Sequence, residues 1–305
     1  MYPIPDVEEA FKILNGSIIF SSMDVASMYW QIGMEEEDKE KTSFILPFGK
    51  YEFNVMPFGL KNAPFTAARA MDAILGGLSH IVCFNFFDDI LVFSENTEEH
   101  LKRLRLVFER LRKFNLKLKP EKCEFLKTSI NFLGNTITRD GLTPDKEKIK
   151  AALKLKKSEP KNCKDAKSLL GFFSFNRRFI KDFARIAYPI ITATKEFVWE
   201  QDQITAVDKL VDLLTKEPIL GHFDTKAYTE LRTDACDLGL GAILCQRQDN
   251  VMKNIAFASR ILSKCEKNYT ITEKECLAVV WSVEKLRDYL KGRLFTIITD
   301  HCSLC

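Results

Sequence analysis

The sequence predicts an α+β fold in two or three domains, and three observations support this prediction. A chain of 305 residues is long enough to bury two or three separate cores. Its apolar fraction of 46% and charged fraction of 29% are those of an ordinary globular protein. Strand-like runs and amphipathic helices alternate in the first part, a lysine-rich helical segment follows, and strands return near the end.

The first part of the chain is expected to contain short helices, strands and hairpins. Phe48-Gly49-Lys50 predicts a turn between two strands, and Pro64 suits the first turn of a helix. The predicted elements are a helix over 6–15, a strand over 16–24, a turn with a short helix over 26–34, two strands over 43–58, a helix over 62–75 and a hairpin over 81–94.

A helix over 98–114 has the clearest periodicity of the chain. Its apolar residues at helical spacing, which we expect to face the core, are Leu101, Leu104, Phe108 and Leu111. A further hairpin is expected to begin at residues 132–134, with its turn at 139–141.

The rest of the chain is expected to be helical to about residue 216, with breaks at Pro160 and Pro189. The composition changes near Pro218. The elements predicted beyond it are a strand, tight turn and strand over 228–246, a helix over 273–290 with Cys276, Val280, Val283 and Leu290 on one face, and a strand over 294–299.

The charge of the chain leaves its interaction with nucleic acids open. The net charge of +3 is too small to require a nucleic-acid partner, but basic residues concentrate in 102–127 and 146–167. Such stripes follow a phosphate backbone in some proteins and are solvated helix faces in others.

The nine cysteines show no CxxC spacing, which favours reduced, intracellular thiols. No apolar run reaches the roughly 18 residues of a membrane helix, so we expect no membrane partner.

Two adjacent aspartates, Asp88 and Asp89, lie between two apolar, strand-like arms. Burying carboxylates is costly unless something binds them, and a divalent cation is the partner we expect. Asp24 follows another strand-like run 64 residues earlier. Three aspartates at neighbouring strand ends suit a two-metal site for phosphoryl transfer. The alternative is a polar hairpin turn, since aspartate is a common turn residue.

Four blocks, in this order, resemble the reverse transcriptases of gypsy-type LTR retrotransposons. Residues 23–32 and 55–64 are similar to the first two palm motifs, 86–89 to the Tyr-x-Asp-Asp box with its tyrosine replaced, and 132–134 to the primer grip. Residues 168–180 resemble the thumb and connection segment. Four short motifs resemble the family's ribonuclease H-like domain. They are Thr233-Asp234-Ala235, Gly239-x-Gly241-Ala242, Thr272-Glu273-Lys274-Glu275 and Thr299-Asp300-His301.

The resemblance implies a fold and a function. The expected fold is a right-hand polymerase palm with partial fingers over 1–140, a thumb and connection over 141–222, and a partial ribonuclease H-like α/β domain over 223–305. The implied function is RNA-directed DNA polymerase with ribonuclease H activity. Its partners would be an RNA template, a DNA primer, RNA–DNA hybrid and deoxynucleoside triphosphates, inside the cell in a cytoplasmic particle or the nucleus. A homo-oligomer is compatible with this reading.

The resemblance also assigns roles in the polymerase region. Asp24 and Asp88 would be catalytic and hold two Mg²⁺ ions, with Mn²⁺ as an alternative, and Asp89 would be a weaker ligand. Tyr29 would lie beneath the sugar of the incoming nucleotide and exclude a 2′-hydroxyl, although a buried core tyrosine is the alternative. The adjacent residues Phe58 and Gly59 would lie close to that nucleotide or to the template.

In the last region the resemblance implies a second catalytic, metal-binding set formed by Asp234, Glu275 and Asp300. For Glu275 there is a structural alternative, because Thr272-x-x-Glu275 also reads as a helix capping box. His301 is expected to pack near these acids rather than to bind metal. The other histidines, at positions 80, 100 and 222, are expected to be structural.

The sequence also departs from the family pattern. The chain is expected to be a fragment of a polyprotein that begins after the first fingers strands and ends before the last ribonuclease H elements. Met28 stands where the family has a small residue, and its side chain is expected to intrude on the nucleotide pocket beside Tyr29. These departures keep two alternatives open, a non-catalytic nucleic-acid-binding remnant and a structural subunit of an active partner.

Overall fold

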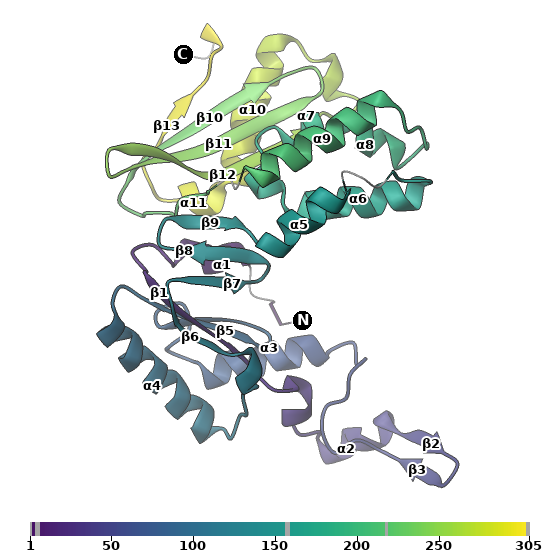
Figure 1. The fold of residues 1–305 in the computed structure, drawn as a ribbon, viewed down its shortest axis with the longest axis vertical. Coiled ribbons are helices and arrows are strands. Elements are labelled where there is room, and N and C mark those ends of the chain that lie inside the picture. Colours follow the sequence, from purple (N-terminus) through teal and green to yellow (C-terminus); the bar gives the residue numbers. More distant parts are fainter. Residues whose placement is uncertain (1, 4–6, 156–158, 217–218, 303–305) are drawn as a thin grey trace. The chain divides into compact units, whose positions relative to one another are not determined.

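A computed structural model describes residues 2–3, 7–155, 159–216 and 219–302. Its helices and sheets form two compact units, residues 1–133 and 134–305 (Figure 1). The predicted α+β class is confirmed, because helices and sheets are mixed along the chain. Three predicted features lie outside the described residues. They are the start of the first helix at residue 6, the pair Lys156 and Lys157 in the second basic stripe, and the change of composition at Pro218.

A four-stranded antiparallel sheet in the order β4-β5-β1-β6 forms the centre of the first unit. The strands of this unit are β1 (Ile19–Asp24), β2 (Phe44–Leu46), β3 (Gly49–Tyr51), β4 (Cys83–Phe86), β5 (Asp89–Ser94), β6 (Glu124–Lys127) and β7 (Ser129–Phe132). Ile90, Leu91 and Val92 are all fully buried. Strand β5 is therefore covered on both faces, which explains its continuous apolar sequence.

The helices of the first unit are α1 (Val7–Lys12), α2 (Glu36–Lys39), α3 (Ala63–Ile74) and α4 (Thr97–Lys113), with short 3-10 helices at Met28–Gln31, Glu40–Thr42 and Pro120–Lys122. The predicted helices over 62–75 and 98–114 are confirmed, and Pro64 lies in the first turn of α3 as expected. The strands predicted over 43–58 are much shorter, and α2 was not predicted. Both strands of the β2–β3 hairpin are exposed.

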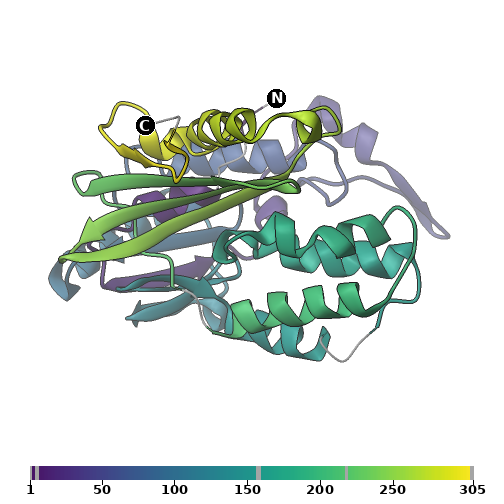
Figure 2. The same ribbon diagram turned by 90° about the horizontal axis from the view of Figure 1, so that it is seen from above.

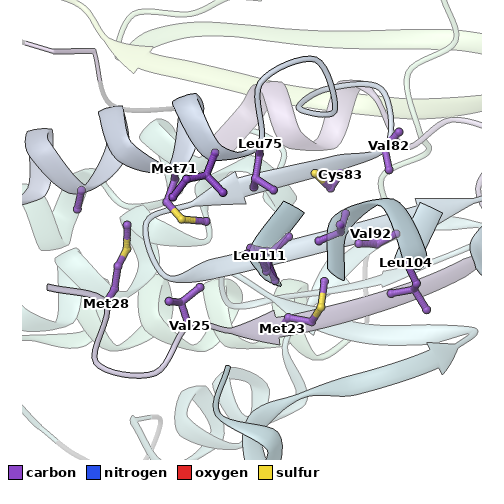
Figure 3. Packing of buried hydrophobic residues seen from close by; sticks show 14 of the residues in the cluster. Met23, Val25, Met28, Met71, Leu75, Val82, Cys83, Val92, Leu104 and Leu111 are labelled. Atoms are coloured by element: carbon purple, nitrogen blue, oxygen red, sulfur yellow. The ribbon is translucent and has the colours of Figure 1, made fainter. Parts of the chain in front are cut away.

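One hydrophobic core joins α3 and α4 to the sheet (Figure 3). Met71 and Leu75 come from α3 and its end, and Leu104 and Leu111 from α4. The predicted inner face of α4 was rotated, because Leu101 and Phe108 are exposed while His100 and Val107 are buried. The periodicity argument ranked residues by hydrophobicity and so passed over a buried histidine.

Met28 belongs to this same core and is labelled in Figure 3. Only 5% of its surface is exposed. The expectation that its side chain intrudes on a nucleotide pocket was therefore wrong. Shortening Met28 would open a cavity in the core rather than clear a pocket.

His100 links α4 to two strands through a directed chain of hydrogen bonds. The Ser94 hydroxyl donates to the Asn96 carbonyl, so it accepts from Nδ1–H of His100 at 2.9 Å. The Ser21 hydroxyl accepts from the backbone N–H of Leu126 and donates to Nε2 of His100 at 2.7 Å. The network thus assigns a neutral imidazole, and burial lowers the pKa of His100 to about 4.

Acid is expected to destabilise the chain through His100. Its folded-state pKa lies below the unfolded value of 6.5, so its contribution is complete above pH 6.5 and is lost as the pH falls towards 4. The loss should reach about 3 kcal/mol, which urea unfolding at a series of pH values measures. His100→Gln should flatten this part of the profile, whereas His80→Asn, at an exposed site, should not. Equal profiles for wild type and His100→Gln would contradict the assignment.

The second unit contains a four-stranded sheet in the order β12-β11-β10-β13. Its strands are β8 (Asn135–Thr138), β9 (Gly141–Pro144), β10 (Tyr228–Ala235), β11 (Gly239–Gln248), β12 (Val251–Ile261) and β13 (Thr296–Ile298). Strands β10, β11 and β12 are antiparallel, and β13 pairs parallel to β10. The predicted strands and turns are confirmed, but β12, the longest strand, was not predicted.

The helices of the second unit are α5 (Lys146–Leu155), α6 (Cys163–Phe175), α7 (Phe183–Ile186), α8 (Tyr188–Ala193), α9 (Gln201–Thr215), α10 (Ile271–Lys285) and α11 (Arg287–Leu290), with 3-10 turns at Arg177–Phe179 and Glu266–Asn268. Helix α10 packs on β10 and β11, while α7 contacts the sheet at β12 and β11, and Figure 2 shows them on opposite sides. Pro189 lies in the first turn of α8, where it begins a helix instead of breaking one.

The predicted inner face of the 273–290 helix was also rotated. Val280 and Cys276 are exposed, while Glu275, Ala278 and Ser282 are buried. The helix is interrupted at Leu286, after which α11 begins. Buried polar residues again mark the true inner face, which a search for apolar residues could not find. Across the described ranges, no helix combines the length and apolarity that a membrane span requires.

Candidate active sites

The first acidic site lies at one end of the sheet in the first unit. Asp24 ends β1 and is the ladder partner of Asp89, which begins β5. Asp88 occupies the turn between β4 and β5, and its carbonyl accepts a hydrogen bond of 2.8 Å from the backbone N–H of Val25. The backbone therefore brings together the three aspartates that the sequence singled out.

The turn that carries Asp88 is strained. Phe86 pairs with Asp89, so only Phe87 and Asp88 form the turn. Phe87 has a φ of 53°, in a region that bulky residues rarely adopt. Such strain costs on the order of 1–3 kcal/mol and is concentrated at functional sites. Nothing in the sequence signalled it, because the usual glycine of such a turn is absent.

The three carboxylates influence one another. Burial, followed by the charges of Asp88 and Asp24, raises the pKa of Asp89 to about 6. Lys122 opposes this effect, and its Nζ lies 2.9 Å from Oδ2 of Asp24. The sequence argument placed Lys122 in the first basic stripe but not at this site, because it is 98 residues away from Asp24. The site thus already binds one positively charged group, the ammonium group of Lys122.

Three further predicted residues lie near one another in the first unit. Tyr29 and Phe58 pack edge to face with ring centroids 5.4 Å apart, and Trp30 contacts Phe58 in the same way at 5.5 Å. Phe58 is exposed, and Gly59 has a φ of 90° with open space around it. Tyr29 also packs against the core, but it is only partly buried. Trp30 was not predicted to belong to this group.

The second acidic site lies in the second unit, where three elements converge. Asp234 is near the end of β10, Glu275 is in α10, and Asp300 follows β13. The parallel register pairs Arg232 with Ile298, so Asp234 and Asp300 each follow two residues later. One ligand oxygen from each of the three acids lies within 4.8 Å of the others. In the described part of the chain, this is the one group of three metal-ligating side chains so close together.

The structure does not support the capping alternative for Glu275. The capping box of α10 is formed by Thr270 and Glu273, whose side chain accepts from the backbone N–H of Thr270 at 2.8 Å. Thr272 instead shares a hydrogen bond of 2.9 Å with Nε2 of His301. Glu275 Oε1 accepts from the backbone N–H of Ala235 at 3.3 Å. The side chain of Glu275 is therefore directed to the strand that carries Asp234.

The donor set of this second site suits a divalent cation. Oε2 of Glu275 is buried and has no hydrogen-bond partner within the described residues. Burial first, and neighbouring carboxylates next, raise the pKa values of both Glu275 and Asp234. Oxygen ligands from carboxylates are those that Mg²⁺ and Mn²⁺ prefer. A cation would satisfy the buried oxygen and relieve the repulsion.

Comparisons with known proteins assign both regions to families. Residues 2–137 match the model of the reverse transcriptase (RNA-dependent DNA polymerase) family, and residues 199–297 match the RNase H-like domain found in reverse transcriptase. The chain is 41% identical to the retrovirus-related Pol polyprotein from transposon 297 of Drosophila melanogaster, over 99% of this chain and 28% of that protein. It is 34% identical to the transposon Tf2-3 polyprotein of Schizosaccharomyces pombe, over 100% of this chain and 23% of that protein. The chain thus spans about a quarter of these relatives.

Solved structures show a similar fold. The foamy viral protease-reverse transcriptase in complex with RNA/DNA hybrid matches 99% of this chain and 42% of its own, with a TM-score of 0.85 and 21% identity. The same viral protein in complex with dsDNA matches with a TM-score of 0.86 and 20% identity, over 100% of this chain and 64% of its own. At these identities the similarity establishes the fold.

Proposed function

Because this chain belongs to the reverse transcriptase and ribonuclease H region of retrotransposon Pol polyproteins, we propose that it is an RNA-directed DNA polymerase that also cleaves the RNA of RNA–DNA hybrids. One observation carries the proposal: each of the two units holds its own acidic site, at the strand ends that carry Asp24 and Asp89 in the first and at Asp234, Glu275 and Asp300 in the second. The division into palm, thumb with connection, and ribonuclease H-like regions is part of this proposal.

In the polymerase site, Asp24 and Asp88 would hold two divalent cations, Mg²⁺ in the cell, with Asp89 as the weaker ligand. Such ions lower the pKa of a primer 3′-hydroxyl and neutralise charge on the triphosphate. Lys122 must then share or release Asp24, to which it is now bound. Tyr29 and Phe58 would position the incoming deoxynucleoside triphosphate through their ring faces and edges.

In the second site, Asp234, Glu275 and Asp300 would hold the cations of an RNA-cleaving centre, which supply a water activated for attack on a phosphodiester. Glu275 is positioned for this role by its hydrogen bond from Ala235. His301 and Thr272 join the segment of Asp300 to the first turn of α10. This bond holds the two elements that carry ligands at a fixed separation.

The proposed partners are an RNA template, a DNA primer and their hybrid. The relatives of known structure were solved in complex with RNA/DNA hybrid and with dsDNA, which supports this choice. The decisive experiment is Mg²⁺-dependent extension of a DNA primer on an RNA template, followed in parallel with cleavage of that RNA. Binding of the hybrid without extension or cleavage would favour a non-catalytic binding protein.

Binding of the primer–template is expected to weaken steeply with salt, because contacts to phosphates release counterions. Lys164 and Lys167 are exposed on α6 and available for such contacts. Replacing both with glutamine should reduce the slope of log affinity against log salt by about two for a duplex, as fluorescence anisotropy would measure. Lys150→Gln is the control, since Lys150 is already paired with Glu147 at 2.7 Å. A flat salt response of the wild type would contradict phosphate binding.

A further inference from the structure

A fourth carboxylate, Asp182, lies close to the acidic site of the second unit but belongs to a different segment. It directly precedes α7, in the left-handed conformation with a φ of 55°. Its Oδ2 accepts a hydrogen bond of 3.0 Å from the guanidinium of Arg185. The side chain is 19% exposed, whereas that of Arg185 is 51% exposed.

The other oxygen of Asp182 is directed at the strand pair that carries Asp234. A Cβ atom added to Gly241 would lie 3.1 Å from Oδ1 of Asp182. Gly241 is the ladder partner of Asp234 in strands β10 and β11. Asp182, Arg185 and Asp234 also line the same small pocket. The absence of a side chain at Gly241 therefore lets the carboxylate of Asp182 approach Asp234.

The electrostatics agree with this geometry. After burial, the charge of Asp182 contributes more than that of Asp300 to raising the pKa of Asp234, and Arg185 acts in the opposite direction. Independently, the buried Oε2 of Glu275 has no hydrogen-bond partner among the residues that the structure describes, which is the state expected of an oxygen that binds a ligand. Without a cation, Asp182 adds a further like charge to a group of three carboxylates.

We propose that Asp182 is a positioning residue that strengthens the binding of a hydrated divalent cation at Asp234, Glu275 and Asp300. It acts through its charge and by accepting hydrogen bonds from waters of the cation, while Arg185 weakens the same binding. The inference rests on the proposed RNA-cleaving site and deepens it. It makes the segment before α7 part of that site, although the segment lies outside the matched RNase H-like region.

The test measures Mn²⁺ binding by electron paramagnetic resonance of the free ion, without nucleic acid. The whole chain carries Asp24→Asn and Asp88→Asn, so that the first unit does not contribute. Asp182→Asn should weaken binding roughly fivefold, the effect of one unit charge on a divalent cation about 5 Å away in a water-like dielectric screened by about 0.1 M salt. Arg185→Gln should strengthen it by a similar factor. Both variants break the same ion pair, so a merely structural role predicts changes in the same direction.

Asp249→Asn is the matched control. Asp249 also has a left-handed backbone, with a φ of 52°, and an ion pair with a lysine four residues later, but its side chain is 92% exposed. It should leave the affinity unchanged. Glu275→Gln should abolish binding, and if it does not, the proposed RNA-cleaving site itself is wrong. If Glu275→Gln abolishes binding while Asp182→Asn has no effect, or changes it in the same direction as Arg185→Gln, only the inference about Asp182 is overturned.

Discussion

Replacing Asp88 with asparagine is expected to reduce primer extension by roughly 10³-fold or more, since a bound metal contributes several kcal/mol to stabilising the transition state. Asparagine fits the turn between β4 and β5, where the carbonyl of residue 88 accepts from the N–H of Val25. The fold should therefore survive. Incorporation of deoxynucleotides on an RNA template, at saturating Mg²⁺, measures the effect.

Two comparisons make this result specific. Glu98→Gln removes one charge from an exposed ion pair of α4 in the same unit and should leave extension intact. RNA cleavage by Asp88→Asn should also be preserved, because Asp234, Glu275 and Asp300 lie in the other unit. Extension by Asp88→Asn at the wild-type rate would exclude the first acidic site as the polymerase centre.

Replacing Glu275 with glutamine is expected to reduce RNA cleavage by roughly 10²-fold or more and to leave primer extension unchanged. The amide oxygen of glutamine can still accept from the backbone N–H of Ala235. Only the charge of the ligand is lost. Cleavage of a labelled RNA strand in a hybrid, assayed beside primer extension, separates the two activities.

The matched control lies two residues earlier on the same helix. Glu273→Gln keeps the capping box with Thr270, because glutamine serves in that position as well. It should keep cleavage. Glu275→Gln should also raise the melting temperature of the metal-free chain, since burial and nearby carboxylates disfavour the ionised Glu275 in the folded state. If Glu273→Gln and Glu275→Gln lost cleavage equally, the loss would come from a disturbed helix α10 and not from removal of a metal ligand.

The acidic residues could be found from sequence because they stand at the ends of strand-like runs. Asp24, Asp88 and Asp89 were placed correctly in space by a simple argument about strand ends. Their catalytic and metal-binding roles stay predictions. The clustering of Asp234 with Glu275 and Asp300 depended on the family resemblance, because a parallel pairing of β10 with β13 cannot be deduced from spacing.

Other features could not be predicted for identifiable physical reasons. The inner faces of α4 and α10 include His100 and Glu275, whose burial depends on tertiary hydrogen bonds and charges rather than on hydrophobicity. Lys122 and Asp182 approach the two sites from segments far away in sequence. A one-dimensional pattern carries information on periods and turns, but not on which distant side chain completes a site.

The left-handed Phe87 has a consequence for how the first acidic site keeps its shape. A turn with an unfavourable backbone would relax if its flanks were loose, and here the flanks are β4 and β5, with Ile90, Leu91 and Val92 fully buried. The position of the Asp88 carboxylate is thus fixed by the buried apolar residues of the strand that follows the turn. A small change in that interior would alter the positions of the three aspartates while the chain stays folded, so loss of the proposed activity would precede any visible loss of structure.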